Sequence, residues 1–344
     1  MKKVFHFVNT NILSGLETMV INISTLVDGY EHYYVSPNGP INAFLRDRGV
    51  KHIPIKRLDP FSVRRVIRQD QPDIVQGHDV IASVCLAMDA HYCKKHHIQM
   101  VSELHNNDAR MVKPGLRANI YLWAAHAFPN IIVVSQSVID EYVYSNAIKD
   151  KATVIKNVVA PGPIEAELKK APVSKKWDAM FLGRLTEQKQ PLKFVDIIKH
   201  MQSKHRVSAV MLGQGELGAA VQKKVVEENL SRLIKLAGFQ SAPYSYLTQA
   251  KVLLIPSLYE GFGLVALEAL LLGVPVIASP VGGLVDIASE KCGGFAKTTA
   301  EFADKALKVV DSPDYQEISQ AARKRGQEIN DIDKFAASFK QIYG

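Results

Sequence analysis

Residues 256–283 read PSLYEGFGLVALEALLLGVPVIASPVGG, and this stretch decides the fold. A β-rich run ending at residue 257, a polar turn, an apolar helical pattern and a second β-rich run are typical of a parallel sheet covered by helices. Between Gly261 and Val285 the only charged side chain is Glu268, in a run of Leu, Val and Ala that predicts burial. An unpaired carboxylate in apolar surroundings is costly, so something must compensate Glu268.

The chain has 344 residues, more than the roughly 250–300 at which one hydrophobic core stops growing, so we expect two domains. No run approaches about 18 consecutive apolar residues, which argues against a membrane-spanning helix. The opening MKKVFHFVNTNILSG predicts a first strand and not a signal peptide, because His6 and Asn9 interrupt its apolar run. Cys85, Cys93 and Cys292 form no CxxC pair, which favours a reducing cytoplasm and argues against structural zinc.

Short β-rich runs alternate with longer helical patterns along the whole chain, which indicates an α/β fold with doubly wound parallel sheets. Residues 158–176 carry three prolines and several charges, which predicts a linker between a domain over 1–160 and a domain over 161–329. In the simplest model the two Rossmann-like domains face each other across a cleft that binds ligands. Strands are expected at 2–8, 32–37, 51–55, 73–78, 99–105, 130–135, 152–157, 177–184, 206–213, 233–239, 252–257, 275–280 and 293–297.

The most basic segment is KHIPIKRLDPFSVRRVIRQ, residues 51–69, with six basic side chains and Asp59 as its one acid. Such a patch suits phosphate groups on an anionic membrane surface or on an acceptor lipid. A solvated helix face is the alternative interpretation. The chain has a formal net charge of +8 but no basic tail, and we expect no nucleic-acid partner.

Glu260 and Glu268 flank the turn and the helix of the opening stretch. Eight residues span at most about 12 Å of helical rise, so one ligand could reach both carboxylates with its hydroxyl groups. Gly261 and Gly263 allow a ligand to approach the backbone, and the N-terminus of the helix favours an anion such as a diphosphate. A purely structural interpretation leaves Glu260 in solvent and pairs Glu268 with a buried Arg or a backbone donor.

Other residues that suit a phosphorylated ligand also follow predicted strands. Arg184 and Lys189 come just after the first strand of the second domain. The planar guanidinium group of Arg184 and the compact ammonium group of Lys189 could neutralise a diphosphate there. Taken alone, each would more often be a surface cation. His105 and His78 end strands of the first domain, and we expect His78 to contact an acceptor.

Together these motifs resemble glycosyltransferase family 4, a group of retaining enzymes with the GT-B fold. Glu260 and Glu268 match the family's pattern of two glutamates separated by seven residues, and the resemblance covers nearly the full chain, most strongly from 177 to 300. The loop before residue 17 departs from the pattern, because many members have two glycines where this chain has Ser14 and Gly15. Further matches in the family's order are SGLE (14–17), FLGRL (181–185), TEQK (186–189), MLGQGEL (211–217), KLAGF (235–239), EALLLGVPVIAS and VGGLVDI.

The resemblance implies a GT-B enzyme with two facing Rossmann-like domains and a C-terminal helix over 330–344 that packs back on the first domain. It implies metal-independent, retaining transfer of a sugar from a nucleotide-diphosphate sugar, with a UDP-sugar favoured and no cofactor. Its catalytic residues would be Arg184, Lys189, Glu260 and His105. Its donor contacts would be Gly15, Gly213, Gly215, Gly238, Gly261, Phe262, Gly263, Leu264 and Glu268.

By analogy with the family, the acceptor would be a hydroxyl group of a glycan or a lipid-linked acceptor in bacterial cell-surface polysaccharide, lipopolysaccharide or teichoic-acid synthesis. The enzyme would be cytoplasmic, with peripheral contact at the inner membrane face. Three alternatives stay open on the same fold: a nucleotide-sugar 2-epimerase, a phosphorylase and an inactive nucleotide-sugar-binding protein.

Overall fold

The computed structural model describes residues 1–106, 108–169 and 174–344, and in it the chain forms two compact units. The first unit comprises Met1–Val158 and Ile332–Gly344, and the second comprises Val159–Asp331. Two sequence expectations fall partly outside the described residues: residues 170–173 of the predicted linker, and Asn107 in the segment after His105.

The first unit is built on a parallel sheet of seven strands in the order β3-β2-β1-β4-β5-β6-β7. Because β1 pairs with β2 on one side and β4 on the other, the strand order reverses at this point, which is where doubly wound sheets bind ligands. The strands are β1 Lys2–Phe7, β2 Tyr30–Pro37, β3 Lys51–Ile55, β4 Ile74–His78, β5 Gln99–Leu104, β6 Asn130–Val133 and β7 Ala152–Val154.

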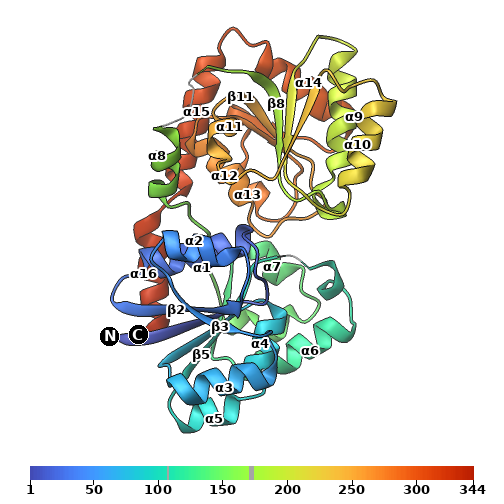
Figure 1. Ribbon diagram of the computed structural model, residues 1–344. Coiled ribbons are helices and arrows are strands. Elements are labelled where there is room, and N and C mark those ends of the chain that lie inside the picture. Colours follow the sequence, from blue (N-terminus) through green and yellow to red (C-terminus); the bar gives the residue numbers. More distant parts are fainter. Residues whose placement is uncertain (107, 170–173) are drawn as a thin grey trace. The chain divides into compact units, whose positions relative to one another are not determined.

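Helices cover both faces of this sheet (Figure 1). α3, α4 and α6 pack side by side on one face, and α1 and α16 pack together on the other. The helices are α1 Gly15–Leu26, α2 Ile41–Asp47, α3 Pro60–Asp70, α4 Val80–Ala87, α5 Ala90–Lys95, α6 Leu116–Ala125, α7 Gln136–Asp140 and α16 Ile332–Tyr343, with 3-10 turns η1 Ala109–Met111, η2 Ser145–Ala147 and η3 Lys149–Lys151.

The last helix, α16, completes the core of the first unit. Phe335, Phe339 and Tyr343 recur at four-residue spacing, so they share one face of the helix, and all three are buried. They pack in one cluster with Val4 of β1 and Val101 of β5. Most of the stabilisation from α16 therefore comes from burying this aromatic face.

The second unit repeats the same topology with a parallel sheet of six strands in the order β10-β9-β8-β11-β12-β13. Its strand order reverses at β8, which pairs with β9 and β11. The strands are β8 Trp177–Leu182, β9 Ala209–Leu212, β10 Ile234–Gly238, β11 Ala250–Ile255, β12 Val276–Ala278 and β13 Gly293–Phe295.

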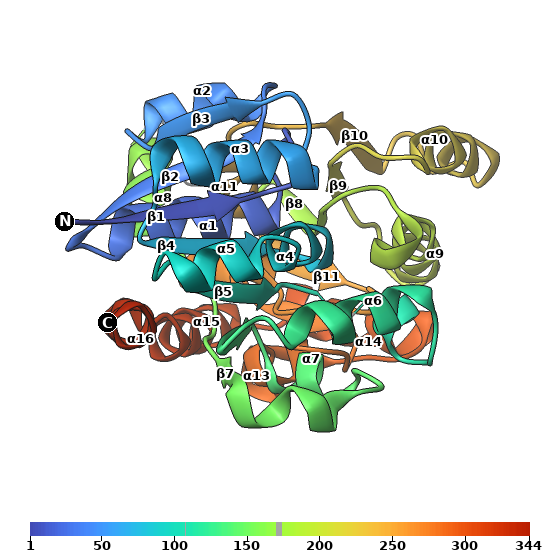
Figure 2. The ribbon, with the colours of Figure 1, turned by 90° about the horizontal axis from the view of Figure 1, so that it is seen from below.

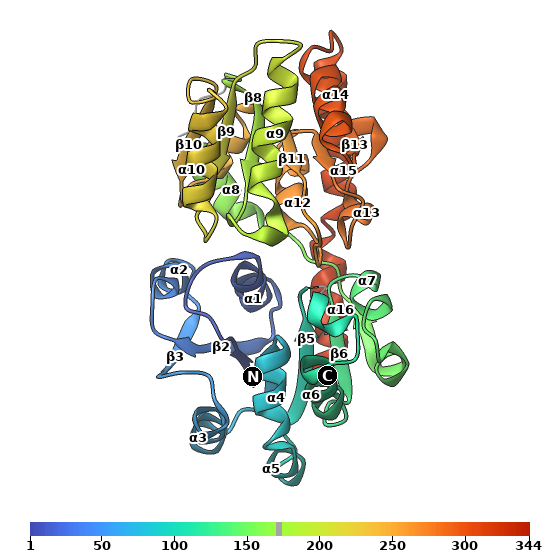
Figure 3. The ribbon, with the colours of Figure 1, turned by 90° about the vertical axis from the view of Figure 1, so that its right-hand side faces the viewer.

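Two groups of helices enclose this second sheet (Figure 3). α9 packs against α10 and α14 in one group, whereas α15 packs against α12 and α13 in the other. The helices are α8 Pro161–Leu168, α9 Pro191–Gln202, α10 Gly218–Glu227, α11 Tyr244–Leu247, α12 Leu264–Leu271, α13 Leu284–Ile287, α14 Thr299–Val310 and α15 Tyr315–Ile329, with 3-10 turns η4 Glu187–Lys189 and η5 Glu290–Cys292.

All thirteen expected strands overlap an observed strand, although the observed strands differ at their ends by up to three residues. The prediction of a structureless linker over 158–176 is wrong in part, because residues 161–168 form α8. Pro161 begins this helix at its first position, where the missing N–H leaves no hydrogen bond unmade. None of the helices in the described part of the chain combines the length and apolar character that crossing a bilayer requires.

We predict that Phe339→Ala lowers the free energy of unfolding of the first unit by about 3–5 kcal/mol, because it leaves a cavity between α16 and the sheet. The exposed Phe61, 77% accessible, supplies the control Phe61→Ala, for which we expect about 0.5 kcal/mol or less. Each unit holds one of the two tryptophans, Trp123 and Trp177, so urea unfolding of a Trp177→Phe background reports on the first unit. Equal effects of the two alanine variants would contradict the packing of α16.

Candidate active site

The loops that follow β8 and β11 lie at the carboxyl edge of the second sheet, because these strands pair in parallel. The backbone N–H of Leu258 donates to the carbonyl of Gln188 at 2.8 Å, and the side-chain amide of Gln188 donates to the carbonyl of Tyr259 at 3.0 Å. These two hydrogen bonds hold the loops together. They bring residues 184–189 next to residues 257–263, which are the two segments in which the sequence predicts most of the site.

A buried carboxylate lies at the centre of these loops. Glu260 is only 5% exposed, so the interpretation that leaves it in solvent is wrong. Lys189 Nζ donates to Glu260 Oε1 at 2.5 Å, and the Ser257 hydroxyl donates to the same oxygen at 2.8 Å. The Lys189 side chain remains 22% exposed. The Lys189 side chain therefore remains partly accessible to a ligand.

Arg184 lies on the same loop as Lys189 but makes almost no contact with the protein. It is exposed, and among the described residues its side chain has one polar partner, Gln188 Oε1 at 3.5 Å, the upper limit for a hydrogen bond. A guanidinium group in this state is available to an incoming anion. Arg184 and Lys189 thus supply two cationic groups at one sheet edge.

Several glycines in these loops are required by close backbone packing within the protein. A Cβ on Gly282 would lie 1.6 Å from the carbonyl oxygen of Glu260, and a Cβ on Gly213 would lie 1.8 Å from that of Gly183. A Cβ on Gly215 would lie 2.4 Å from the carbonyl oxygen of Leu185. Gly213 and Gly215 therefore position the loop that carries Arg184, and their contact with a donor stays a prediction.

The turn into α12 holds four of the predicted donor contacts. Gly263 caps the helix with φ +102°, and a Cβ there would lie 2.6 Å from Leu284. The side chains of Phe262 and Leu264 are buried, so these residues can offer a ligand little except their backbone. Gly261 lies in the same turn, and a Cβ on Gly283 would lie 2.6 Å from the carbonyl oxygen of Gly261.

Glu268, the fifth residue of α12, has no cationic partner among the described residues. The Tyr244 hydroxyl donates to Glu268 Oε1 at 3.1 Å, so the predicted pairing with a buried Arg or a backbone donor is wrong. Burial raises the pKa of Glu268 to about 7, the nearby carboxylate of Glu167 adds to this shift, and the Tyr244 hydroxyl opposes it. Holding this group ionised at neutral pH costs the folded state about 3 kcal/mol.

Tyr244 and Glu167 come from α11 and α8, and sequence reasoning missed both. Glu167 Oε1 accepts a hydrogen bond from the backbone N–H of Ser245 at 2.6 Å, which joins the two helices. Burial raises the pKa of Glu167 as well. No sequence motif marks these residues, and only their position beside Glu268 shows their importance.

Gly238, another predicted donor contact, ends β10 with φ +67°. No heavy atom lies within 4 Å of the position that a Cβ would take there.

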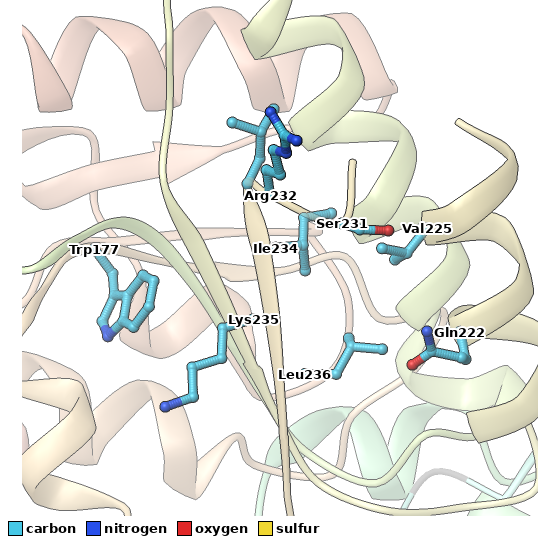
Figure 4. Close-up of a pocket in the computed structure, with 9 residues that line it drawn as sticks. Trp177, Gln222, Val225, Ser231, Arg232, Ile234, Lys235 and Leu236 are labelled. Carbon is cyan, nitrogen blue, oxygen red and sulfur yellow. The ribbon is translucent and has the colours of Figure 1, made fainter. Parts of the chain in front are cut away.

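A pocket of about 390 Å³ lies elsewhere in this unit, at the amino-terminal edge of the sheet. Figure 4 shows Trp177 on one side of β10 and Gln222 and Val225 on the other. Trp177 and Ile234 are the first residues of β8 and β10. Because open α/β sheets bind ligands at the carboxyl ends of their strands, this pocket is distinct from the candidate site.

In the first unit, four buried histidines form a relay that crosses neighbouring strands β2, β1 and β4 and ends just after β5. His32 Nδ1 lies 2.9 Å from His6 Nε2, and His6 Nδ1 lies 2.9 Å from His78 Nε2. His78 Nδ1 then lies 2.9 Å from Glu103 Oε2 and 3.2 Å from His105 Nε2. His78 has no exposed surface, so the prediction that it contacts an acceptor is wrong for this structure.

The hydrogen bonds between the histidine rings all run in one direction, because the carbonyl of Val27 at the start of the relay can only accept a hydrogen bond. His32 Nε2 lies 2.8 Å from this carbonyl and must carry a proton there. The neutral His32 ring therefore accepts at Nδ1 from His6 Nε2, and the neutral His6 ring accepts at Nδ1 from His78 Nε2. His78 Nδ1 then faces both Glu103 Oε2 and His105 Nε2. One nitrogen or oxygen atom of each of His78, Glu103 and His105 lies within 4.8 Å of the others, a grouping that could hold a metal ion.

His105 is held in its neutral form at the end of this relay. Burial lowers its pKa to about 4, although Glu103 opposes the shift. Its Nδ1 atom is buried and has no hydrogen-bond partner among the described residues. The pKa of His6 is also lowered well below its ordinary value, first by burial and then by His78 and His32.

Gly15, the other predicted site residue of the first unit, is the first residue of α1. Ser14 precedes it as the N-cap, but its hydroxyl accepts no capping hydrogen bond from the backbone and donates to the buried carboxylate of Glu17 at 2.5 Å. The Thr10 hydroxyl contacts the same carboxylate. A negative charge in the first turn complements the helix dipole, so Glu17 stabilises the loop that leads from β1 to Gly15.

Comparison with known proteins matches both units to glycosyltransferase families. Residues 14–162 match the model described as Glycosyltransferase Family 4, and residues 164–325 match the model described as Glycosyl transferases group 1. The chain belongs to glycosyltransferase family 4. As a family 4 chain, it has the GT-B fold predicted from its motifs.

The family 4 chain is also similar to individual proteins. An uncharacterized glycosyltransferase of Methanocaldococcus jannaschii is 25% identical over 64% of this chain and 58% of its own length. A second from the same organism is matched over 63% of its length, so the chain spans about three fifths of these curated relatives. The structure of HepE from Anabaena in complex with UDP and glucose superposes with a TM-score of 0.82 at 18% identity, covering 99% of each chain. The apo lipopolysaccharide outer core galactosyltransferase WaaB superposes with a TM-score of 0.70 at 18% identity, covering 99% of each chain.

We predict that Lys189→Met destabilises the second unit by about 2 kcal/mol, because the buried Glu260 carboxylate loses its cation. The loss is below that of a fully buried pair, since Lys189 is partly exposed. Lys199→Met is the matched control, because Lys199 pairs with Glu228 on the surface and should contribute about 0.5 kcal/mol or less. Urea unfolding followed through Trp177 measures both. If adding Glu260→Gln to Lys189→Met restored no stability, the buried charge would not be the cause.

We predict that the first unit loses stability as pH falls from about 6.5 to about 4. His6, His32 and His105 have lowered pKa values in the folded state, so the unfolded chain binds more protons in this range. Each histidine that stays neutral in the folded state lowers the free energy of unfolding by up to about 1.4 kcal/mol for each pH unit of this fall. Urea unfolding in the Trp177→Phe background, repeated across this range, measures the slope. A free energy of unfolding that stayed constant from pH 6.5 to 5 would contradict the relay.

Proposed function

We propose that this family 4 glycosyltransferase moves a sugar from a UDP-sugar to a hydroxyl group of a glycan or lipid-linked acceptor, with retention of anomeric configuration and without a metal ion. The observation that carries the proposal is the arrangement of Arg184, Lys189 and Glu260 at the carboxyl edge of the second sheet. Lys189 lies 2.5 Å from the buried Glu260 carboxylate and remains partly exposed, and Arg184 is exposed on the same loop as Lys189.

Breaking the bond between a sugar and a diphosphate requires stabilisation of the negative charge on the leaving group. In the proposed mechanism Arg184 binds the diphosphate through its planar fork, and Lys189 adds a compact charge. The N-terminus of α12 at Gly263 adds backbone N–H groups and the helix dipole. These groups are in place before the reaction, which is the usual source of the largest catalytic effect.

Glu260 and Lys189 act together in this proposal. The carboxylate holds the ammonium group at the edge of the site, and the diphosphate then competes with Glu260 for Lys189 when the donor binds. Displacement of Lys189 leaves the Glu260 carboxylate able to accept hydrogen bonds from sugar hydroxyls. The Ser257 hydroxyl, at 2.8 Å, keeps one oxygen of Glu260 fixed during this exchange. His105 is proposed as the catalytic residue of the first unit, held neutral by burial at the end of its relay.

A sugar nucleotide would also give Glu268 hydrogen-bond donors beyond the Tyr244 hydroxyl, its partner among the described residues. Ribose hydroxyls that donate to this carboxylate would compensate the charge that burial disfavours. UDP is the favoured nucleotide because the complex of HepE holds UDP and glucose. Similarity to WaaB, a lipopolysaccharide outer core galactosyltransferase, supports the proposal of an acceptor in cell-surface glycan synthesis. Both the nucleotide and the acceptor are inferred from similarity.

We predict that Arg184→Ala lowers kcat/KM for the UDP-sugar about 100-fold or more while leaving stability unchanged, because Arg184 acts on the leaving group and has almost no contact with the protein. Arg232→Ala is the matched control, since Arg232 lines the pocket at the opposite edge of the sheet. Nucleotide release from UDP-, GDP- and ADP-sugars with a panel of acceptors measures turnover, and NMR of the product gives the anomeric configuration. Equal turnover in the two variants would contradict the site, and acceptor-independent formation of an altered free sugar would instead indicate an epimerase.

We predict that UDP-glucose binds more tightly as pH rises through about 7, because ribose hydroxyls need the ionised form of Glu268 and the pKa of this group is raised to about 7. Donor binding should in turn lower that pKa. The sugar diphosphate itself has no group that titrates near pH 7, so calorimetric titrations between pH 6 and pH 8 report on the protein. Glu268→Gln should bind more weakly and lose this pH dependence. If the wild-type pH profile persisted in Glu268→Gln, another group would be responsible.

A further inference from the structure

Three side chains of a kind that ligates metal ions converge where β4 and β5 of the first unit end. His78 is the last residue of β4 and lies in register with Glu103 of β5, and Figure 2 shows these two strands side by side. His105 follows Glu103 at a spacing of two residues, which places both side chains on the same face of the sheet. Among the described residues, this is the one group of three or more histidine, cysteine or acidic side chains close enough to hold an ion.

The distances between the donor atoms suit a single tetrahedral ion. Donor atoms that lie about 2.0–2.1 Å from a tetrahedral Zn²⁺ are about 3.3–3.4 Å from one another. His78 Nδ1 lies 2.9 Å from Glu103 Oε2 and 3.2 Å from His105 Nε2, and His105 Nε2 lies 3.6 Å from Glu103 Oε1. The three measured distances bracket the required value, so small shifts of these side chains would admit an ion.

The histidine relay turns a lone pair of His78 towards this group. Because His78 Nε2 donates to His6 Nδ1 at 2.9 Å, the neutral His78 ring carries no proton on Nδ1. Nδ1 then faces a carboxylate oxygen of Glu103, which can only accept. Two acceptors at this separation repel each other unless a cation lies between them. That cation is either a metal ion or an additional proton.

Neighbouring side chains orient the ligands in the way that metal sites require. A ligating histidine usually donates its other ring N–H to a fixed partner, and a ligating carboxylate is itself hydrogen-bonded. His6 is that partner for His78, and Gln76 Nε2 donates to Glu103 Oε2 at 2.6 Å. The side-chain carbonyl of Gln76 in turn accepts from the Tyr343 hydroxyl. The tautomer of His78 and the orientation of Glu103 are therefore fixed before any ion binds.

His105 lies on the side from which an ion would enter. Its side chain is 4% exposed, whereas those of His78 and Glu103 are 0% and 1% exposed. Its Nδ1 atom has no hydrogen-bond partner among the described residues, so no such contact decides which ring nitrogen carries the proton. Nε2 can therefore offer its lone pair to an ion.

We propose that His78, Glu103 and His105 bind one divalent transition-metal ion, with Zn²⁺ as the best fit. Two imidazole nitrogens and one carboxylate form a known set of zinc ligands, which leaves a fourth position for water. Imidazole suits Zn²⁺ and its transition-metal neighbours, whereas Mg²⁺ and Ca²⁺ prefer sites made of oxygen atoms. The bound ion would join the ends of β4 and β5 and would occupy His105 Nε2.

An ion at this position would inhibit the transfer proposed above, in which no metal ion takes part. His105 cannot act on the sugar while its Nε2 atom ligates an ion. This consequence rests on the proposed function, whereas metal binding does not and is measured without donor or acceptor. A chain that binds no Zn²⁺ would leave the transferase proposal intact, and a chain that is inactive towards UDP-sugars would leave metal binding intact.

The test of binding uses the full chain without an affinity tag, freed of metal by a chelator. Calorimetric titration with ZnCl₂ gives the stoichiometry and the affinity, and the visible absorption of bound Co²⁺ reports its coordination. We expect one Zn²⁺ per chain, a Co²⁺ spectrum typical of four nitrogen and oxygen ligands, and no binding of Mg²⁺ at the same concentration.

The stability of each unit supplies a second measurement. An ion that binds the folded first unit raises the melting temperature of that unit by mass action. Zn²⁺ should therefore raise the melting temperature followed through Trp123 in the Trp177→Phe variant. It should leave unchanged the melting temperature followed through Trp177 in the Trp123→Phe variant, which reports on the second unit.

Matched variants test the ligands themselves. Loss of an outer partner of a metal ligand costs about 10–100-fold in affinity, so we expect Glu103→Gln and His105→Gln each to weaken Zn²⁺ binding about 100-fold or more. His205→Gln is the control, because His205 also faces a carboxylate, that of Asp311 at 3.8 Å, but on the surface of the second unit. It should bind Zn²⁺ as the wild type does. If a ligand variant does not fold, NMR of the histidine-labelled wild-type chain with one equivalent of Co²⁺ replaces it, and the ring signals of His78 and His105 should be lost.

Three results would overturn the proposal: no binding of Zn²⁺ or Co²⁺ by the wild-type chain, binding that both ligand variants leave unchanged, or a Co²⁺ spectrum with the intense near-ultraviolet band of a thiolate ligand. The first would show that an additional proton, and not a metal ion, lies between His78 and Glu103. The last would place the ion at a cysteine.

Discussion

The arrangement of the second unit depends on the approach of two backbones where Gly282 faces the carbonyl of Glu260. A Cβ at Gly282 would lie 1.6 Å from that oxygen, so only glycine allows the loop after β12 to close over the loop after β11. This contact, together with the hydrogen bonds through Gln188, fixes the backbone of Glu260. The side chain is then placed against Lys189, and the chemistry proposed for this edge of the sheet follows from that placement.

Two buried glutamates of this chain have pKa values shifted in opposite directions. Burial alone would raise the pKa of Glu103, but His105, His78 and Gln76 together lower it. Glu268 has the hydroxyl of Tyr244 and the repulsion of Glu167, and its pKa is raised to about 7. Glu103 is thus fully partnered by its own unit, whereas Glu268 has neither a cation nor a backbone donor among the described residues. A residue that lowers stability in the absence of ligand is typical of a binding site and not of a packing core.

Sequence reasoning predicts those features that depend on local pattern. Each strand shows as a short β-rich run, and the segment around Glu260 and Glu268 is a contiguous motif, so its turn and helix could be placed without coordinates. Contacts between distant segments could not be predicted in this way. Tyr244 reaches Glu268 from another helix, and His6, His32 and His78 meet only because β2, β1 and β4 are neighbours in the sheet.

The order of segments along the chain has a consequence for biosynthesis. The core of the first unit includes Phe335, Phe339 and Tyr343 of α16, which are made after the whole of the second unit. While the ribosome completes residues 159–331, the apolar groove that receives α16 has no occupant. The nascent first unit therefore presents an open hydrophobic face to solvent throughout that time, and chaperones that shield such faces would act during this interval.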